Sequence, residues 1–156
     1  LETELAGLVL VGASAGLADP AEREARAAAD DAWADRITAD FDQFLFDWSA
    51  QPLFADRAGQ PVPAYRRDQR PQGLAAAMRA FSTGRQAPLH DRLAGLATPT
   101  VLVAGERDEK FKAISADLAA RLPHAHVLLA ADAGHDVPTD SPSAVIAALA
   151  ALAQPV

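Results

Sequence analysis

The sequence predicts an α/β fold in which helices cover a parallel sheet. Three short apolar runs, residues 5–11, 99–104 and 125–130, are continuous rather than alternating, which is typical of strands buried on both faces. Helical patterns follow the second and third runs, at residues 110–122 and 142–152. This strand, helix, strand, helix order is that of a right-handed parallel α/β unit.

Between the first and second strands, residues 12–98 form far more chain than one crossover helix needs. The insertion opens with Asp19-Pro20, a helix cap and first turn, and continues as an Ala-, Glu- and Arg-rich helix to about Ile37. An aromatic stretch, a Pro- and Gly-rich turn at residues 59–63 and a helix near residues 73–81 follow. Mostly helical insertions of this kind form lids that contact substrate.

We divide the chain into a sheet strand with its turn, a helical lid with a return helix, and a strand-helix-strand-helix segment, at residues 1–18, 19–98 and 99–156. Three strands make a small α/β sheet with two edges. Since a whole domain of this kind has about 250 residues, we expect roughly 100 residues of N-terminal sheet to precede this part. The chain is thus predicted to be the C-terminal part of a larger domain.

Composition excludes several functional classes. The net charge of −7 disfavours nucleic-acid binding, and the lack of cysteine excludes disulfides, thiolate metal ligands and thiol nucleophiles. No run approaches the roughly 20 apolar residues of a membrane span, and Glu2 and Glu4 do not match a signal peptide. We therefore expect a cytoplasmic protein without a membrane span. Lys110 and Lys112 are the only lysines among 14 basic residues; clustered arginines would suit a small anionic substrate, although composition bias accounts for most of them.

Two candidate catalytic residues follow neighbouring strands. Asp108 lies in the loop after residues 99–104, and His135 lies in the loop after residues 125–130. Catalytic groups gather beyond the carboxyl ends of parallel strands, and the order acid then histidine is that of α/β hydrolases. The carboxylate would fix the imidazole tautomer. Asp108 could alternatively be only a helix N-cap, His135 could be only a turn residue, and Glu106 and Asp132 are rival acids.

The sequence Gly12-Ala13-Ser14-Ala15-Gly16 matches the nucleophile pattern G-x-S-x-G. We interpret it as a turn, because a nucleophile elbow leads directly into a buried helix, whereas here a strongly charged helix begins only after Asp19-Pro20. A dinucleotide-binding turn is excluded because no acidic residue ends a strand about 20 positions later. No cofactor or metal site is predicted.

Several motifs together resemble one family. They are LVLVGASAGL, the E-R-x-x-R of residues 22–26, the F-x-x-x-W-x-x-x-P-L-F of residues 44–54, the S-T-G-x-Q-x-P of residues 82–88, and G-E-R-D-E-K-F of residues 105–111 with Gly134-His135. The chain resembles the C-terminal portion of the α/β-hydrolase-fold lyases of menaquinone biosynthesis, the 2-succinyl-6-hydroxy-2,4-cyclohexadiene-1-carboxylate synthases. The resemblance implies elimination of pyruvate from a polyanionic carboxylate substrate through a Ser-His-Asp triad.

The resemblance also implies individual roles. Asp108 would orient His135, Arg26 and Arg66 would bind substrate carboxylates, and Trp48 would form a pocket wall. Arg26 could instead pair with Glu22 on a solvated helix face, Trp48 could be a core anchor, and Arg67 could replace Arg66. The family's serine, a following arginine and the oxyanion loop have no counterpart here.

Two other functions stay open. The chain could come from another lidded α/β hydrolase that cleaves an ester, thioester or carbon–carbon bond, because a triad defines mechanism more firmly than substrate. It could also be a truncated, non-catalytic chain that assembles through its exposed sheet edge with the missing N-terminal half or with a second chain.

Overall fold

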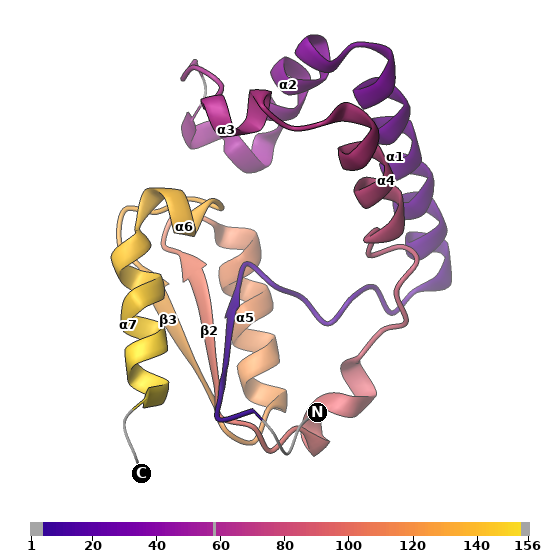
Figure 1. Cartoon of the computed structure of the whole chain (residues 1–156). Helices are drawn as coiled ribbons and strands as arrows, with labels where there is room; N and C mark the ends of the chain where they lie inside the picture. Colours follow the sequence, from indigo (N-terminus) through magenta and orange to yellow (C-terminus); the bar gives the residue numbers. More distant parts are fainter. Residues whose placement is uncertain (1–4, 58, 154–156) are drawn as a thin grey trace. The chain divides into compact units, whose positions relative to one another are not determined.

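The computed structural model describes residues 5–57 and 59–153 (Figure 1). Residues 1–4 of the predicted first segment lie outside this part. The chain divides into two compact units, one made of residues 1–15 and 89–156 and the other of residues 16–88. The first holds the sheet, and the second is helical.

The sheet has three parallel strands in the order β1-β2-β3, with bounds β1 Leu8–Val11, β2 Thr100–Gly105 and β3 Ala125–Ala130. The predicted α/β class is confirmed. β1 is shorter than the predicted run of residues 5–11; Leu5 is exposed, and Gly7 precedes the first residue that pairs with β2. β2 is the central strand and is buried along its whole length.

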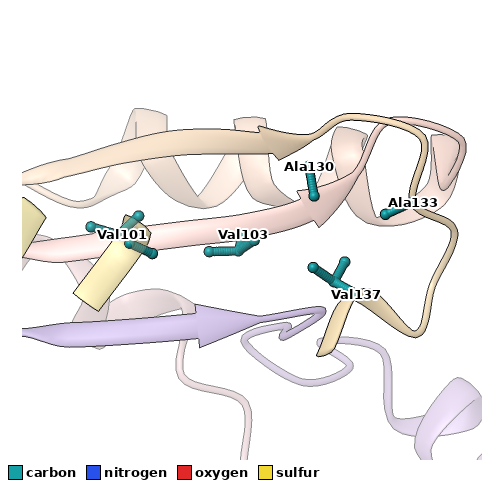
Figure 2. Packing of buried hydrophobic residues seen from close by; sticks show 6 residues of the cluster. Val101, Val103, Ala130, Ala133 and Val137 are labelled. Carbon is teal, nitrogen blue, oxygen red and sulfur yellow. The ribbon is translucent and has the colours of Figure 1, made fainter. Parts of the chain in front are cut away.

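Helices pack on both faces of the sheet (Figure 1). On one face, Val101 and Val103 of β2 pack with Ala148 of helix α7, Pro142–Ala153. Figure 2 shows Val101 and Val103 in this cluster, beside Ala130, Ala133 and Val137. On the other face, Leu102 packs with Leu118 of helix α5, Glu109–Arg121. Successive β2 side chains therefore face opposite layers, which explains why the run is apolar without alternation.

Two short helical turns complete this unit: a 3-10 helix at His90–Gly95 and helix α6 at Val137–Asp140. Neither was predicted, because each is too short to show helical periodicity. Val137 of α6 is buried in the cluster at the sheet's carboxyl end. The turn after His135 is therefore anchored to the core.

The helical unit contains α1 Pro20–Ala39, α2 Phe41–Ser49, a 3-10 helix at Pro52–Arg57, α3 Ala64–Arg67 and α4 Pro71–Ala80. The predicted helix to about residue 37 is confirmed as α1, and the helix near residues 73–81 as α4. The predicted aromatic stretch forms α2.

Helix caps and packing define the helical unit. The Asp19 carboxylate accepts a hydrogen bond from the N–H of Ala21 at 2.8 Å, and Pro20 occupies the first turn of α1. Ile37 of α1 is fully buried with Phe44 of α2 and Ala75 of α4. No helix in the described part of the chain is long and apolar enough to cross a membrane.

Candidate active site

Asp108 lies where β2 ends and α5 begins, and it performs two structural tasks with two different oxygens. As N-cap of α5, its Oδ1 accepts a hydrogen bond from the N–H of Phe111 at 3.1 Å. Its Oδ2 lies 2.7 Å from Nδ1 of His135. The residue is only 7% exposed. The cap and the histidine partner, which the sequence offered as alternatives, are therefore both present in one side chain.

His135 lies in the loop after β3, at the same sheet end as Asp108 because β2 and β3 are adjacent and parallel. The Nδ1–Oδ2 contact is the geometry in which a carboxylate accepts the Nδ1 proton of a neutral imidazole. Nε2 is then the unprotonated nitrogen, able to accept a proton from another group. The His135 side chain is 23% exposed and that of Asp108 5% exposed, so the contact is largely shielded from water.

Close backbone packing holds the two loops together. A Cβ atom on Gly105 would lie 2.0 Å from the carbonyl oxygen of Gly134 and 2.4 Å from that of Ala133. The N–H of Arg107 donates to the oxygen of Ala133 at 3.0 Å, and the N–H of Gly134 donates to the Asp140 carboxylate at 3.0 Å. Gly105 and Asp140, which hold these loops together, were not predicted from the sequence. The glycine of G-E-R-D was the available signal for a close approach.

The rival acids occupy a different position. Glu106 and Asp132 are exposed, and the Asp132 N–H donates to Glu106 Oε2 at 3.3 Å. Asp132 has a positive φ of 54°, a turn conformation that aspartate tolerates better than most residues. Among the three acids, the short contact with Nδ1 of His135 belongs to Asp108.

The G-x-S-x-G segment after β1 does not form a strand-to-helix elbow. Residues 12–18 are non-helical, and α1 begins only at Pro20. Gly12 has a φ of +55°, and a Cβ there would lie 3.3 Å from Cε1 of His135. The turn leaving β1 therefore passes beside the imidazole ring. This geometry supports interpreting the segment as a turn rather than as a nucleophile elbow.

Arg26, in α1, pairs with Asp30 rather than with Glu22. Its Nε donates to both carboxylate oxygens of Asp30, at 2.9 and 2.8 Å. Asp30 is 3% exposed, whereas Glu22 lies on an exposed helix surface. The buried carboxylate is the stronger partner because its charge needs compensation. The Arg26 side chain is 46% exposed, and the hydrogen bonds described for it use Nε alone.

Trp48, at the end of α2, belongs to an aromatic cluster of the helical unit. Its ring centroid lies 5.3 Å from that of Trp33 at an interplanar angle of 80°, and 5.7 Å from that of Phe44. The ring is partly buried against this core. These contacts favour the core-anchor interpretation, and the partial exposure leaves part of the ring available to a ligand.

Arg66 and Arg67 differ in their surroundings. Arg66 is half-buried and lines a small pocket, whereas Arg67 is exposed. The Arg66 guanidinium carbon lies 5.8 Å from the ring centroid of Phe54 and 5.8 Å from that of Tyr65. The other residues that line the pocket are Ser49, Phe54, Gln60, Pro61, Val62 and Pro63. The structure therefore favours Arg66 over Arg67 as the arginine that meets a ligand.

The S-T-G motif has a packing role in the helical unit. A Cβ on Gly84 would lie 2.4 Å from the carbonyl oxygen of Arg23 and 2.5 Å from the nitrogen of Ala27, both in α1. The Gly84 N–H donates to the buried Ser82 hydroxyl at 3.2 Å. This turn therefore packs directly on the α1 backbone, next to the turn that carries Arg26.

A family model described as the α/β hydrolase family matches residues 3–149. The chain belongs to the α/β hydrolase family, in agreement with its parallel sheet and with an acid and a histidine beyond adjacent strand ends.

Comparison with individual proteins is more specific. The chain is 40% identical over 148 residues to a 2-succinyl-6-hydroxy-2,4-cyclohexadiene-1-carboxylate synthase of Klebsiella pneumoniae subsp. pneumoniae, covering 92% of this chain and 57% of the relative. It is 34% identical over 150 residues to the synthase of Salmonella heidelberg, covering 94% of this chain and 58% of the relative. The resemblance predicted from the motifs is confirmed.

Solved structures agree. The structure described as MenH from S. aureus superposes with a TM-score of 0.86 at 29% identity, over 95% of this chain and 58% of that one. A hydrolase from Pseudomonas aeruginosa has a TM-score of 0.63 at 26% identity, over 94% of this chain and 54% of that one. The chain thus spans less than two thirds of the length of these relatives, as expected for a partial domain.

Proposed function

We propose that this chain supplies the acid and the histidine of a Ser-His-Asp triad in a menaquinone-pathway lyase. The observation that carries the proposal is the 2.7 Å contact between Asp108 Oδ2 and His135 Nδ1, in a chain whose relatives are 2-succinyl-6-hydroxy-2,4-cyclohexadiene-1-carboxylate synthases. The reaction is elimination of pyruvate from a succinyl-enolpyruvyl-hydroxycyclohexene carboxylate.

In the proposed mechanism, the serine hydroxyl gives its proton to Nε2 of His135, and the serine oxygen takes the proton next to the substrate carbonyl in its place. The carboxylate of Asp108 keeps the Nδ1 proton in place and stabilises the imidazolium that forms. The electrons of the broken C–H bond form a C=C bond in the substrate ring and expel the enolpyruvyl group as the enolate of pyruvate. This enolate takes up the proton held on His135 and becomes pyruvate, which restores the neutral imidazole. No cofactor is required, because the carbonyl of the substrate accepts the developing charge.

The substrate carries several carboxylates, and two arginines are proposed to bind them. Arg26 has its Nε held by Asp30, so its terminal nitrogens can form a planar contact with a carboxylate. Arg66 contributes a second guanidinium at the edge of the small pocket that Phe54 also lines, and Trp48, in the neighbouring aromatic cluster, contributes an apolar wall.

We further propose that the serine and the oxyanion loop come from the part of the relatives that this chain does not span. In the described part of the chain, β1 pairs with β2 along one edge only. That open edge would accept the missing half or a second chain. Without such a partner, we expect the chain alone to be inactive.

The test measures pyruvate release by a protein that contains this chain and has the full length of the relatives. Release that is lost on His135→Ala supports the lyase. Turnover of simple esters without pyruvate release would instead identify another lidded α/β hydrolase. Ser14→Ala should leave turnover unchanged, and abolished turnover would make Ser14 the nucleophile.

A further inference from the structure

Phe111, in the first turn of α5, contacts both members of the acid-histidine pair. Its backbone N–H donates to Asp108 Oδ1 at 3.1 Å, and its ring centroid lies 4.6 Å from that of His135 at an interplanar angle of 39°. We propose that Phe111 is a positioning residue, whose ring restrains His135 in the Nδ1-protonated orientation that presents Nε2 to the reacting groups.

The backbone contact assigns the two oxygens of Asp108 to different partners. Because Oδ1 is engaged by the N–H of Phe111, the carboxylate is fixed in rotation and Oδ2 is directed at Nδ1 of His135. A carboxylate held in this way selects one imidazole tautomer, since only a protonated Nδ1 can donate to it. This contribution is made by the main chain and would survive a change of side chain.

The ring contact adds a restraint to the one that the carboxylate supplies. A half-turn of the imidazole about its Cβ–Cγ bond would place Cδ2, instead of Nδ1, against Asp108 and break the hydrogen bond that selects the Nδ1-protonated tautomer. The Phe111 ring lies against the imidazole, and Gly12 lies beside it, where a Cβ atom would be 3.3 Å from Cε1. Rotation therefore requires displacing an aromatic side chain. An aromatic pair of this geometry is worth about a 3- to 10-fold population preference.

The test separates the ring from the backbone. Phe111→Ala and Phe111→Leu keep the N–H that caps α5 but remove the ring. Ile114→Ala is the matched control, because Ile114 lies on the same helix but packs with Leu102 and Leu118 on the sheet side. The readout is the ¹⁵N chemical shifts of the His135 ring in the 156-residue chain, assigned with His135→Gln and recorded near pH 8, where ordinary histidine is neutral.

Unsubstituted protein and Ile114→Ala should show the Nδ1-protonated form. Phe111→Ala should raise the population of the other tautomer about 3- to 10-fold, with a smaller rise for Phe111→Leu. Unchanged tautomer populations in both Phe111 variants would overturn the proposal and leave the ring as ordinary packing. If Phe111→Ala does not fold by circular dichroism, the Phe111→Leu comparison decides in the same way.

A kinetic arm rests on the proposed lyase function and uses the protein at the full length of its relatives. Phe111→Leu should lower kcat about 3- to 10-fold with KM little changed, because the ring acts on the histidine rather than on substrate. Absence of pyruvate release by the unsubstituted protein would refute the lyase function while leaving the tautomer result valid. A change in KM alone would contradict the positioning role.

Discussion

Gly105→Ala tests the packing that brings the acid and the histidine together. Gly105 is the last residue of β2, and the backbone of the His135 loop passes directly over it. A single methyl group there would lie 2.0 Å from the Gly134 oxygen, 2.4 Å from the Ala133 oxygen and 2.8 Å from the Ala133 carbonyl carbon. All three neighbours are main-chain atoms, so no side-chain rotation can relieve the overlap.

The size of the effect follows from these distances. Real Cβ contacts shorter than 3.0 Å essentially never occur, so the Gly134 carbonyl must retreat by about 1 Å. That movement breaks or stretches the hydrogen bond from Arg107 N–H to the Ala133 oxygen and pulls on the loop that carries His135. Overpacking usually costs about 1–3 kcal/mol, and the rigid neighbours place this substitution at the upper end. A displacement of about 1 Å in a catalytic group can cost about 100-fold in rate.

The free energy of unfolding of the chain is measured by urea denaturation. Turnover is measured with a protein that contains this chain and has the full length of the relatives. Gly95→Ala is the control, since a Cβ at Gly95 would meet nothing within 4 Å, and it should change stability by less than about 1 kcal/mol. Gly105→Ala should lower the free energy of unfolding by about 3 kcal/mol. A variant as stable and as active as the unsubstituted protein would refute the close-approach explanation.

Three further predictions concern Asp108, Arg26 and Leu102. Asp108→Asn should keep the α5 cap and change the free energy of unfolding by less than about 0.5 kcal/mol, but it should lower kcat by about 10⁴-fold. Asp108→Ala should in addition lower the free energy of unfolding by about 1 kcal/mol, because the cap is lost. Activity of Asp108→Asn equal to that of the unsubstituted protein would exclude the catalytic role. Arg26→Ala should lower the free energy of unfolding by about 1–3 kcal/mol in chemical denaturation, because it leaves Asp30 buried without its counter-ion. Glu22→Ala should leave the free energy of unfolding unchanged. Equal effects of the two substitutions would contradict the pairing of Arg26 with Asp30. Leu102→Ala should lower the free energy of unfolding by about 2–5 kcal/mol in the same measurement, because the β2 residue Leu102 is 1% exposed and packs against α5. A loss below about 1 kcal/mol would show that this core is poorly packed.

The fold was predictable where the sequence carries a strong local signal. β2 and β3 are continuous apolar runs, and α5 and α7 have helical patterns of 13 and 12 residues. The short helix α6 was not predicted because four residues show no periodicity. Its position depends on burial of Val137 against the sheet, a tertiary contact that no local pattern encodes.

The candidate site was predictable to the level of residue type and strand end. The topology rule placed Asp108 and His135 beyond adjacent strands, and the structure puts their side chains within 2.7 Å. The sequence could not distinguish Asp30 from Glu22 as the partner of Arg26, because both lie four residues away along α1. Burial decides this choice, and burial depends on how α1 packs with its neighbours.

Both members of the acid-histidine pair, and the contacts described for them, lie within the sheet unit. Gly105, Asp108 and Phe111 lie on one continuous segment from β2 into α5, and His135 joins them from the next loop. The hydrogen bonds described for the pair join residues close in the sequence or join the loops that follow neighbouring strands. We therefore expect the pair to form in this chain by itself. Nuclear magnetic resonance of His135 in this chain should thus show the oriented imidazole even where no turnover is detected. A freely rotating ring would mean that contacts from outside this chain are needed to form the pair.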